Sequence, residues 1–417
     1  MKILEIEGQR ELSGTIRVSG AKNSVVALIP AAILSDEEVT ICNVPEITDT
    51  DALCEILDGL NVSVKRASES LVIDPKNMEN IEIKEEYSKK LRASYYFMGA
   101  LLGKYKKAVM YFPGGCSIGK RPINLHLKGF EEMGATIKSE GNKFIVEADE
   151  LKGANIYLDF ASVGATINIM LAAVKAKGIT IIDNAAKEPE IVNIATFLNN
   201  MGAKVTGAGT STIKIRGVES LHGCFHEVIP DRIEAGTYMI IGALCGKRLK
   251  IDNIIPEHLE SLSSKLIETG AEVEVGNDYV VISKGVKTKP ANIKTSVYPG
   301  FPTDLQQPFT VVLTQCDGKS KVEETIWENR FMHVAYLNKL GADITIKNQT
   351  ATIYGPTKLK GCDVVATDLR AGAAMVCAAL IAKGKTTITN IDHILRGYEQ
   401  IVEKLTNVGA KIENKEI

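Results

Sequence analysis

The sequence predicts an α/β protein in which six similar units form two domains, with helices inside and sheets outside. A short motif, Gly-Ala followed by any residue and then Ile or Val, recurs along the chain. Its marker positions are 61, 134, 202, 270, 341 and 409, roughly 70 residues apart, with Asn61 in place of glycine in the first copy. Alanine-rich segments that are apolar nearly all round recur in phase with it. Such helices must be buried among one another, so the sheets are expected outside them.

Each unit is expected to contain an apolar helix, a strand, an amphipathic helix and further strands. The apolar helix leads through a short turn into an alternating strand, most clearly at 39–43, 179–184 and 386–390. Near the C-terminus, we expect the amphipathic helix at 395–408 and the next strand at 411–413. Three units match a preferred domain size, which suggests one domain of residues 22–229 and another of residues 1–21 with 230–417.

Composition limits the partners and the location. The 417 residues carry 49 Lys and Arg against 51 Asp and Glu, so a nucleic acid is not an expected partner. The longest apolar run, 371–382, falls short of the roughly 20 residues of a membrane-spanning helix. The N-terminal residues 1–8 become acidic too early for a secretory signal. We therefore expect a cytoplasmic protein without a membrane segment.

The eight cysteines are scattered, and most lie in apolar surroundings, as Cys245 and Cys377 do. This pattern is typical of reduced core cysteines. A zinc site is an alternative, because His222, Cys224 and His226 alternate and a strand would place them on one face. Structural zinc sites usually have four ligands, and the sequence contains no C-x-x-C pair, so the zinc interpretation is the weaker one.

Cys116 is the best candidate for a reactive residue. It lies in Pro113-Gly-Gly-Cys-Ser-Ile-Gly-Lys-Arg-Pro122, where prolines and glycines prevent a helix or strand from continuing. Lys120 and Arg121 follow within five residues, and nearby cations favour the thiolate. We expect a nucleophile or proton donor here. The alternative is a small residue that a loop tolerates.

A site for a small anion is predicted where the apolar helices begin. Helix N-termini present unpaired backbone N–H groups and the positive end of the helix dipole. Four of the six junctions add a Lys or Arg; the junctions are 19–23, 91–92, 162–165, 230–232, 303–304 and 367–370. The gap between the two domains, into which these helix starts would point, is the expected place for the site.

Arginine and aspartate are the side chains of interest at these junctions. The planar fork of arginine suits a carboxylate or phosphate, and six arginines lie at junctions or in loops after strands: Arg92, Arg121, Arg232, Arg330, Arg370 and Arg396. Structural pairing, for example Arg370 with Asp368, is the alternative for each of them. Asp304 is the leading candidate for a general base. An aspartate at a helix start is often only an N-cap, however, and Asp231 and Asp368 occupy equivalent positions.

Nine segments together resemble the UDP-N-acetylglucosamine enolpyruvyl transferase family, in order along the whole chain. They are the Cys116 loop, Ser19-Gly-Ala-Lys-Asn-Ser24, Leu91-Arg-Ala-Ser94, Ser162-Val-Gly-Ala-Thr166, Glu188-Pro-Glu190, Phe301-Pro-Thr-Asp304, Glu328-Asn-Arg-Phe331, Thr367-Asp-Leu-Arg370 and Arg396-Gly-Tyr398. The resemblance implies an inside-out α/β barrel fold of six βαβαββ units in two domains. It also implies transfer of the enolpyruvyl group of phosphoenolpyruvate to the 3-hydroxyl of UDP-N-acetylglucosamine with release of phosphate. That reaction is the first committed step of peptidoglycan synthesis and the target of fosfomycin. We expect a monomer that needs no metal or organic cofactor.

The resemblance further implies a role for each matching residue. Cys116 would donate a proton to the methylene carbon of phosphoenolpyruvate, and Asp304 would accept the proton of the sugar hydroxyl. Phosphoenolpyruvate would be held by Lys22, Asn23, Arg121 and Arg396. The nucleotide sugar would contact Arg92, Arg121, Pro122, Ile123, Asn124, Leu125, Ser162, Val163, Asp304 and Ile326. The site would be supported by Asp231, Arg330, Asp368 and Arg370.

Two positions depart from the family pattern. Asn124 stands where many relatives have Asp, so the details of its contact with the uridine are not implied. Phe160 replaces a Lys found in some members, so a phosphate contact at this position is not implied. Two alternative functions are considered. A shikimate-pathway enolpyruvyl transferase shares the repeats but lacks the cysteine loop. A non-catalytic paralogue would bind the nucleotide sugar and regulate cell-wall synthesis, but the presence of both the acid and the base argues against it.

Overall fold

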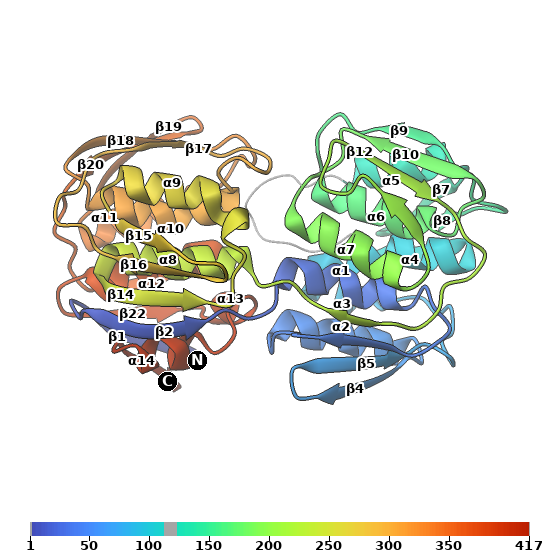
Figure 1. Cartoon of the computed structure of the whole chain (residues 1–417), viewed down its shortest axis with the longest axis horizontal. Helices are drawn as coiled ribbons and strands as arrows, with labels where there is room; N and C mark the ends of the chain where they lie inside the picture. The colour runs from blue at the N-terminus through green and yellow to red at the C-terminus, as the bar shows by residue number, and fades with distance from the viewer. Residues whose placement is uncertain (1, 112–122, 417) are drawn as a thin grey trace. The chain divides into compact units, whose positions relative to one another are not determined.

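The computed structural model describes residues 2–111 and 123–416. These residues form two compact units, each with its own apolar core. The first unit contains residues 2–19 and 230–416, and the second contains residues 20–111 and 123–229. We describe each unit by itself (Figure 1).

Three apolar helices form the centre of each unit. In the first unit they are α8 (Arg232–Cys245), α10 (Thr303–Thr314) and α12 (Leu369–Ile381), and in the second α1 (Lys22–Ala32), α4 (Tyr96–Tyr105) and α6 (Val163–Ala173). Helices α8, α10 and α12 contact one another. Every residue of α6 from Ala165 to Ala173 is buried. A helix without a polar face is stable only in such surroundings, and the expectation that these helices lie inside is confirmed.

Sheets lie around the helices of each unit, three per unit among the described residues (Figure 1). In the first unit their strand orders are β15 (Glu272–Val275), β16 (Tyr279–Ser283), β14 (Gly246–Asp252), β2 (Leu12–Arg17); β17 (Asn292–Lys294), β18 (Gly318–Glu323), β20 (Thr350–Gly355), β19 (Asp343–Lys347); and β21 (Asp363–Val365), β22 (Lys385–Thr389), β1 (Lys2–Glu7), β23 (Lys411–Glu416). In the second unit they are β13 (Phe225–Glu227), β3 (Val39–Cys42), β5 (Ser70–Asp74), β4 (Ser63–Ala67); β11 (Lys204–Thr206), β12 (Thr212–Arg216), β10 (Ile179–Asp183), β9 (Asn155–Tyr157); and β6 (Lys107–Tyr111), β8 (Lys143–Glu147), β7 (Thr136–Glu140). The predicted fold class is confirmed.

The repeat motif marks the end of the second helix in each of the six sequence repeats. These helices are α2 (Thr48–Gly59), α5 (Asn124–Glu132), α7 (Pro189–Asn200), α9 (Glu260–Glu268), α11 (His333–Leu340) and α14 (Ile401–Asn407). Each is followed by a residue with left-handed backbone, with φ of 60° at Asn61 and between 91° and 108° at the glycines of the other five copies. Glycine adopts this conformation without strain and asparagine tolerates it. The six marker positions therefore share one physical cause. The remaining helices of the described residues are α3 (Glu85–Lys90), η1 (Arg92–Tyr95), η2 (Pro256–Leu259) and α13 (Asp392–Leu395).

The helix predicted at 395–408 is wrong in its first half. Helix α13 ends at Leu395, a turn follows over 396–400, and α14 begins at Ile401. Gln400 has φ of 49°, which interrupts the helical backbone, and Tyr398 in the turn is buried. The turn thus presents Arg396 outside any helix. The strand predicted at 411–413 lies within β23 and is confirmed.

Two strands pair in a way that the linear repeat did not predict. Strand β2 precedes α1 in the sequence but pairs with β14, and β13 precedes α8 but pairs with β3. The segments that connect β2 to α1 and β13 to α8 also bond to each other. The N–H of Asp231 donates to the carbonyl of Ser19 at 2.9 Å, and the N–H of Ala21 donates to the carbonyl of Ile229 at 2.7 Å. Of the helices in the described ranges, none is long and apolar enough to cross a membrane.

Candidate active site

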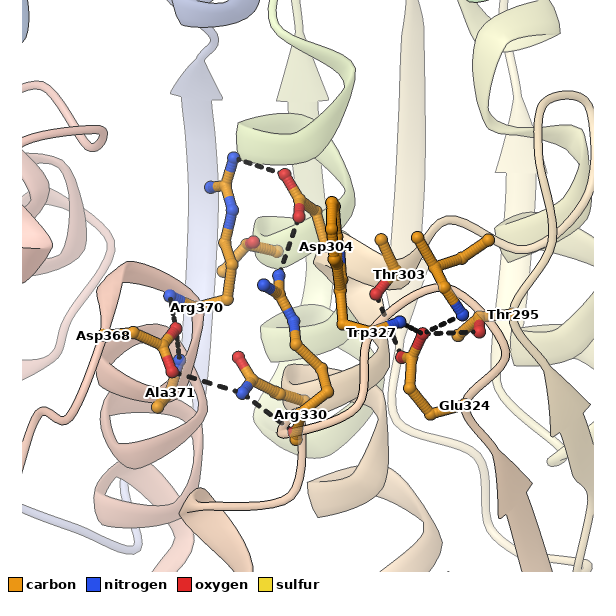
Figure 2. A network of polar contacts seen from close by, with 12 residues as sticks. Thr295, Thr303, Asp304, Glu324, Trp327, Arg330, Asp368, Arg370 and Ala371 are labelled. Carbon is orange, nitrogen blue, oxygen red and sulfur yellow. Dashed lines mark hydrogen bonds and ion pairs between the residues drawn. The ribbon is translucent and has the colours of Figure 1, made fainter. Parts of the chain in front are cut away.

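The carboxylate of Asp304, in the first turn of α10, is held by two arginines (Figure 2). Arg330 Nη2 donates to Oδ1 at 2.7 Å, and Arg370 Nη2 donates to Oδ2 at 3.2 Å. The arginine side chains are only 3% and 4% exposed, whereas that of Asp304 is 29% exposed. The two buried cations therefore orient a carboxylate that solvent still reaches.

The three junction aspartates, which position alone did not distinguish, differ in their contacts. Asp231 Oδ1 accepts from the backbone N–H groups of Ile233 and Glu234 at 2.8 and 3.0 Å, so it caps α8. Asp368 Oδ1 accepts from the N–H groups of Arg370 and Ala371 at 2.9 and 3.0 Å and caps α12 (Figure 2). Both aspartates are buried. Helix α10 is instead N-capped by Pro302, and Asp304, the second residue of the helix, bonds to the two arginines.

The structural alternative for Arg370 was an ion pair with Asp368. The guanidinium of Arg370 does not form that pair. Only the backbone N–H of Arg370 reaches that residue, while the guanidinium bonds to Asp304 and Tyr398. Burial opposes the charge of Arg370, but Tyr398, Asp304 and Asp231 outweigh it and raise its pKa above the usual value. Arg330 and Arg370 are thus buried partners of a carboxylate.

Ile326 belongs to the same region through the buried carboxylate of Glu324. Glu324 accepts from the hydroxyls of Thr295 and Thr303, both at 2.9 Å, and from the N–H of Ile326 at 2.9 Å. Thr303 directly precedes Asp304. Glu324 therefore ties the loop that carries Ile326 to the start of α10 (Figure 2). Glu324 could not be singled out in the sequence, because a single glutamate after a strand carries no distinguishing pattern.

In the second unit, Lys22 and Asn23 begin helix α1. Lys22 Nζ lies 2.9 Å from Oδ2 of Asp49, and the two side chains are 14% and 5% exposed. A lysine at a helix N-terminus opposes the helix dipole, and Asp49 offsets that repulsion. Asp49 could not be singled out in the sequence either. In the sequence it resembles an ordinary acidic residue in the first turn of α2.

Arg92 begins the 3₁₀ helix η1 at the predicted junction. Its guanidinium carbon lies 5.8 Å from the ring centre of Tyr95, and burial lowers its pKa. The Tyr95 ring packs edge-on against His126 with 5.0 Å between centres, and His126 Nδ1 lies 2.9 Å from Asn168 Nδ2. Burial, followed by the charge of Arg92, lowers the pKa of His126 to about 3, so this histidine is neutral.

The other predicted nucleotide-sugar residues lie at two helix starts of the second unit. Ser162 caps α6, with its hydroxyl accepting from the N–H of Ala165 at 3.3 Å, and Val163 is the first residue of that helix. Asn124 begins α5 with an exposed side chain, between buried Ile123 and half-buried Leu125.

Three predicted residues, Cys116, Arg121 and Pro122, lie outside the described residues, so their roles stay predictions. Arg396 caps the C-terminal end of α13 and is half-buried. In residues 2–111 and 123–416 there is no group of three side chains that could hold a metal ion. His226, from the zinc alternative, instead lies against the amides of Asn193 and Asn200 at 3.0 and 3.2 Å.

Comparison with known proteins decides the family. Residues 6–405 match the family model for EPSP synthase (3-phosphoshikimate 1-carboxyvinyltransferase). UDP-N-acetylglucosamine 1-carboxyvinyltransferase 2 of Bacillus cereus is 55% identical, covering 99% of this chain and 96% of that protein. The protein of the same name in Listeria monocytogenes is 53% identical, covering 98% and 97%. The chain belongs to the UDP-N-acetylglucosamine 1-carboxyvinyltransferase family.

Solved structures agree with this family assignment. The crystal structure of the enolpyruvyl transferase NikO from Streptomyces tendae superimposes with a TM-score of 0.90 at 28% identity, covering 99% of both chains. EPSP synthase from Acinetobacter baumannii gives a TM-score of 0.77 at 18% identity, which shows the shared fold only. The family inferred from the nine sequence segments is confirmed, and the shikimate-pathway alternative is the less supported one.

Proposed function

We propose that this enzyme transfers the enolpyruvyl group of phosphoenolpyruvate to the 3-hydroxyl of UDP-N-acetylglucosamine and releases phosphate. The observation that carries the proposal is the oriented Asp304 carboxylate in a chain that belongs to this transferase family. The reaction commits the nucleotide sugar to peptidoglycan synthesis. A cytoplasmic monomer that acts on small molecules suits this function and stays a prediction.

The proposed chemistry needs an acid and a base. The Cys116 thiol donates its proton to the methylene carbon of phosphoenolpyruvate, which leaves positive charge on the carbon that bears the phosphate. The sugar 3-hydroxyl attacks that carbon, and Asp304 accepts the hydroxyl proton. The Cys116 thiolate then takes back a proton from the new methyl group, which restores the double bond and expels phosphate, and Asp304 passes the proton that it accepted to solvent.

The arginine pair bears on how Asp304 can act. A carboxylate is a far weaker base than an alkoxide, so Asp304 is a weak base toward an ordinary alcohol. The attacking hydroxyl becomes strongly acidic only as its bond to the positive carbon forms. Proton transfer is therefore timed to the attack, and the geometry set by Arg330 and Arg370 matters more than high basicity.

The anionic donor would be held by cations at helix starts and turns. We assign Lys22, Asn23, Arg121 and Arg396 to phosphoenolpyruvate. Lys22 suits this role because Asp49 holds its ammonium in place beside the N-terminus of α1. The nucleotide sugar is assigned to Arg92, Ile123, Asn124, Leu125, Ser162, Val163, Asp304, Ile326 and the segment Arg121–Pro122. We assign supporting roles to Asp231, Arg330, Asp368 and Arg370.

A phosphate-release assay tests the proposal. The purified chain is given phosphoenolpyruvate with UDP-N-acetylglucosamine, with shikimate 3-phosphate, or alone. Release of phosphate only with the nucleotide sugar is expected. Release with shikimate 3-phosphate would favour the shikimate-pathway reaction. Binding of the nucleotide sugar by calorimetry without any turnover would favour the non-catalytic paralogue.

A further inference from the structure

A buried chain of hydrogen bonds runs behind the Asp304 site within the first unit. Arg370 bonds to Asp304 through Nη2, and its other terminal nitrogen, Nη1, donates to the hydroxyl oxygen of Tyr398 at 3.1 Å. The Tyr398 hydroxyl lies 2.9 Å from Oγ1 of Thr237, and Thr237 Oγ1 lies 2.9 Å from the carbonyl oxygen of Ile233. Thr237 and Ile233 belong to α8, whereas Arg370 belongs to α12.

The donors and acceptors along this chain have only one consistent direction. A guanidinium can only donate, so the Tyr398 oxygen accepts from Arg370. The Ile233 carbonyl can only accept, so the single hydroxyl proton of Thr237 goes to it. Tyr398 must therefore donate its own proton to Thr237. Burial raises the pKa of Tyr398, which keeps that proton on the phenol.

Burial and ring packing strengthen the hydrogen bonds between Arg370, Tyr398 and Thr237. Tyr398 is 1% exposed, Thr237 is 1% exposed and Arg370 is 3% exposed, so water does not compete for these bonds. The guanidinium carbon of Arg370 also lies 5.5 Å from the ring centre of Tyr398. Tyr398 therefore fixes both the position and the rotation of the Arg370 guanidinium, and with them the nitrogen that holds Asp304.

Tyr398 also belongs to the turn that presents Arg396. The turn follows α13, and the N–H groups of Gly397 and Tyr398 both donate to the carbonyl of Ile394, at 3.1 and 3.2 Å. Anchoring the Tyr398 side chain under α8 and α12 thus holds a residue two positions from Arg396. One buried phenol is connected both to the proposed base and to the proposed donor-binding turn.

We propose that Tyr398, with Thr237 behind it, is a positioning residue for this reaction: it orients Arg370, and through it the Asp304 carboxylate, and fixes the Arg396 turn. Neither side chain contacts a reacting atom in this assignment. The inference rests on the proposed function, in which Asp304 is the base and Arg396 binds phosphoenolpyruvate.

The test uses Tyr398→Phe, Thr237→Val and Thr237→Ser in the full chain, with Tyr354→Phe as the matched control. Tyr354 is an exposed tyrosine of the same unit, on β20. For each variant we measure kcat, the KM of both substrates and the melting temperature. Tyr398→Phe keeps the ring but removes the hydroxyl. We expect kcat to fall about tenfold, the size of one hydrogen bond to a charged group, with a raised KM for phosphoenolpyruvate.

Four further results are expected if the residues act by positioning. The KM for UDP-N-acetylglucosamine stays within about twofold of the wild-type value. Thr237→Val behaves like Tyr398→Phe, whereas Thr237→Ser keeps wild-type turnover because its hydroxyl still makes both hydrogen bonds. The double variant Tyr398→Phe with Thr237→Val has a kcat no lower than either single variant, because both substitutions break the same series of hydrogen bonds. Wild-type kcat and KM values in Tyr398→Phe, or a loss of melting temperature alone, would overturn the inference.

Failure of the proposed function would be visible separately, as a wild-type protein that releases no phosphate from the two substrates. The hydrogen bonds from Tyr398 to Arg370 can then be tested without an activity assay, from the NMR signals of the Arg370 guanidinium. Slow rotation of that group in the wild type should become fast in Tyr398→Phe and stay slow in Tyr354→Phe. Equal rotation in wild type and Tyr398→Phe would refute the positioning of Arg370.

Discussion

Replacing Asp304 by asparagine tests the central feature of the site. The Asp304→Asn variant keeps the size of the side chain but removes its charge and most of its basicity. Loss of a general base lowers turnover by about 10²- to 10⁴-fold. Binding of UDP-N-acetylglucosamine should stay measurable by calorimetry, since Asp304 is only one of the many residues assigned to the nucleotide sugar.

The same substitution should also destabilise the first unit. Arg330 and Arg370 are 3% and 4% exposed at their side chains, and both lose their anionic partner. Removing one member of a buried ion pair costs about 3–5 kcal/mol. Asp304 is 29% exposed and the asparagine oxygen still accepts one bond, so we expect a loss of about 2–3 kcal/mol. For a unit of this size, that is a fall in melting temperature of roughly 4–12 °C.

Asp231→Asn is the matched control, because it makes the same change at an equivalent junction. Asp231 is an N-cap, a role that asparagine fills about as well as aspartate, so its cost should be smaller than that of Asp304→Asn even though Asp231 also raises the pKa of Arg370. Phosphate release and thermal unfolding are measured for both variants. Near-normal kcat in Asp304→Asn would assign the base elsewhere. Equal stability loss in the two variants would refute the argument from the buried arginines.

Three other predictions concern the thiol, the donor and pH. Cys116→Ala should abolish turnover and also covalent labelling by fosfomycin, read by mass spectrometry; full labelling of the variant would exclude Cys116 as the reactive thiol. Arg396→Ala should raise the KM of phosphoenolpyruvate more than that of UDP-N-acetylglucosamine, and equal increases would contradict its assignment. Burial lowers the pKa of His126 and His333 to about 3 and that of His226 to about 4, so the unfolded chain binds more protons than the folded one below its ordinary histidine pKa. Stability should therefore be level above about pH 6.5 and fall below it, by about 2 kcal/mol for each histidine at pH 5. Urea unfolding at pH 7 and pH 5 measures this loss, which His226→Gln should reduce by one histidine's share; an unchanged difference would count against the buried neutral state.

Much of the fold could be predicted from the sequence because it depends on local chemistry. The left-handed residue after each second helix requires glycine or asparagine, so the repeat could be read directly from the six marker positions. The central helices lack a polar face, which requires burial. The turn at 396–400 could not be predicted in the same way. Its apolar spacing resembles a helix, and only the burial of Tyr398 beneath two other helices explains the interruption.

The candidate site was likewise predictable from the sequence only in part. The sequence by itself determined the family, the candidate residues and their placement at helix starts, since these follow from residue type and spacing. Only the tertiary structure distinguished Asp304 from Asp231 and Asp368, because a cap and a carboxylate held by arginines differ in partners that are distant in sequence. Asp304 is 26 residues from Arg330 and 66 from Arg370. Such contacts arise from the packing of α8, α10 and α12 around one centre, and no local pattern encodes them.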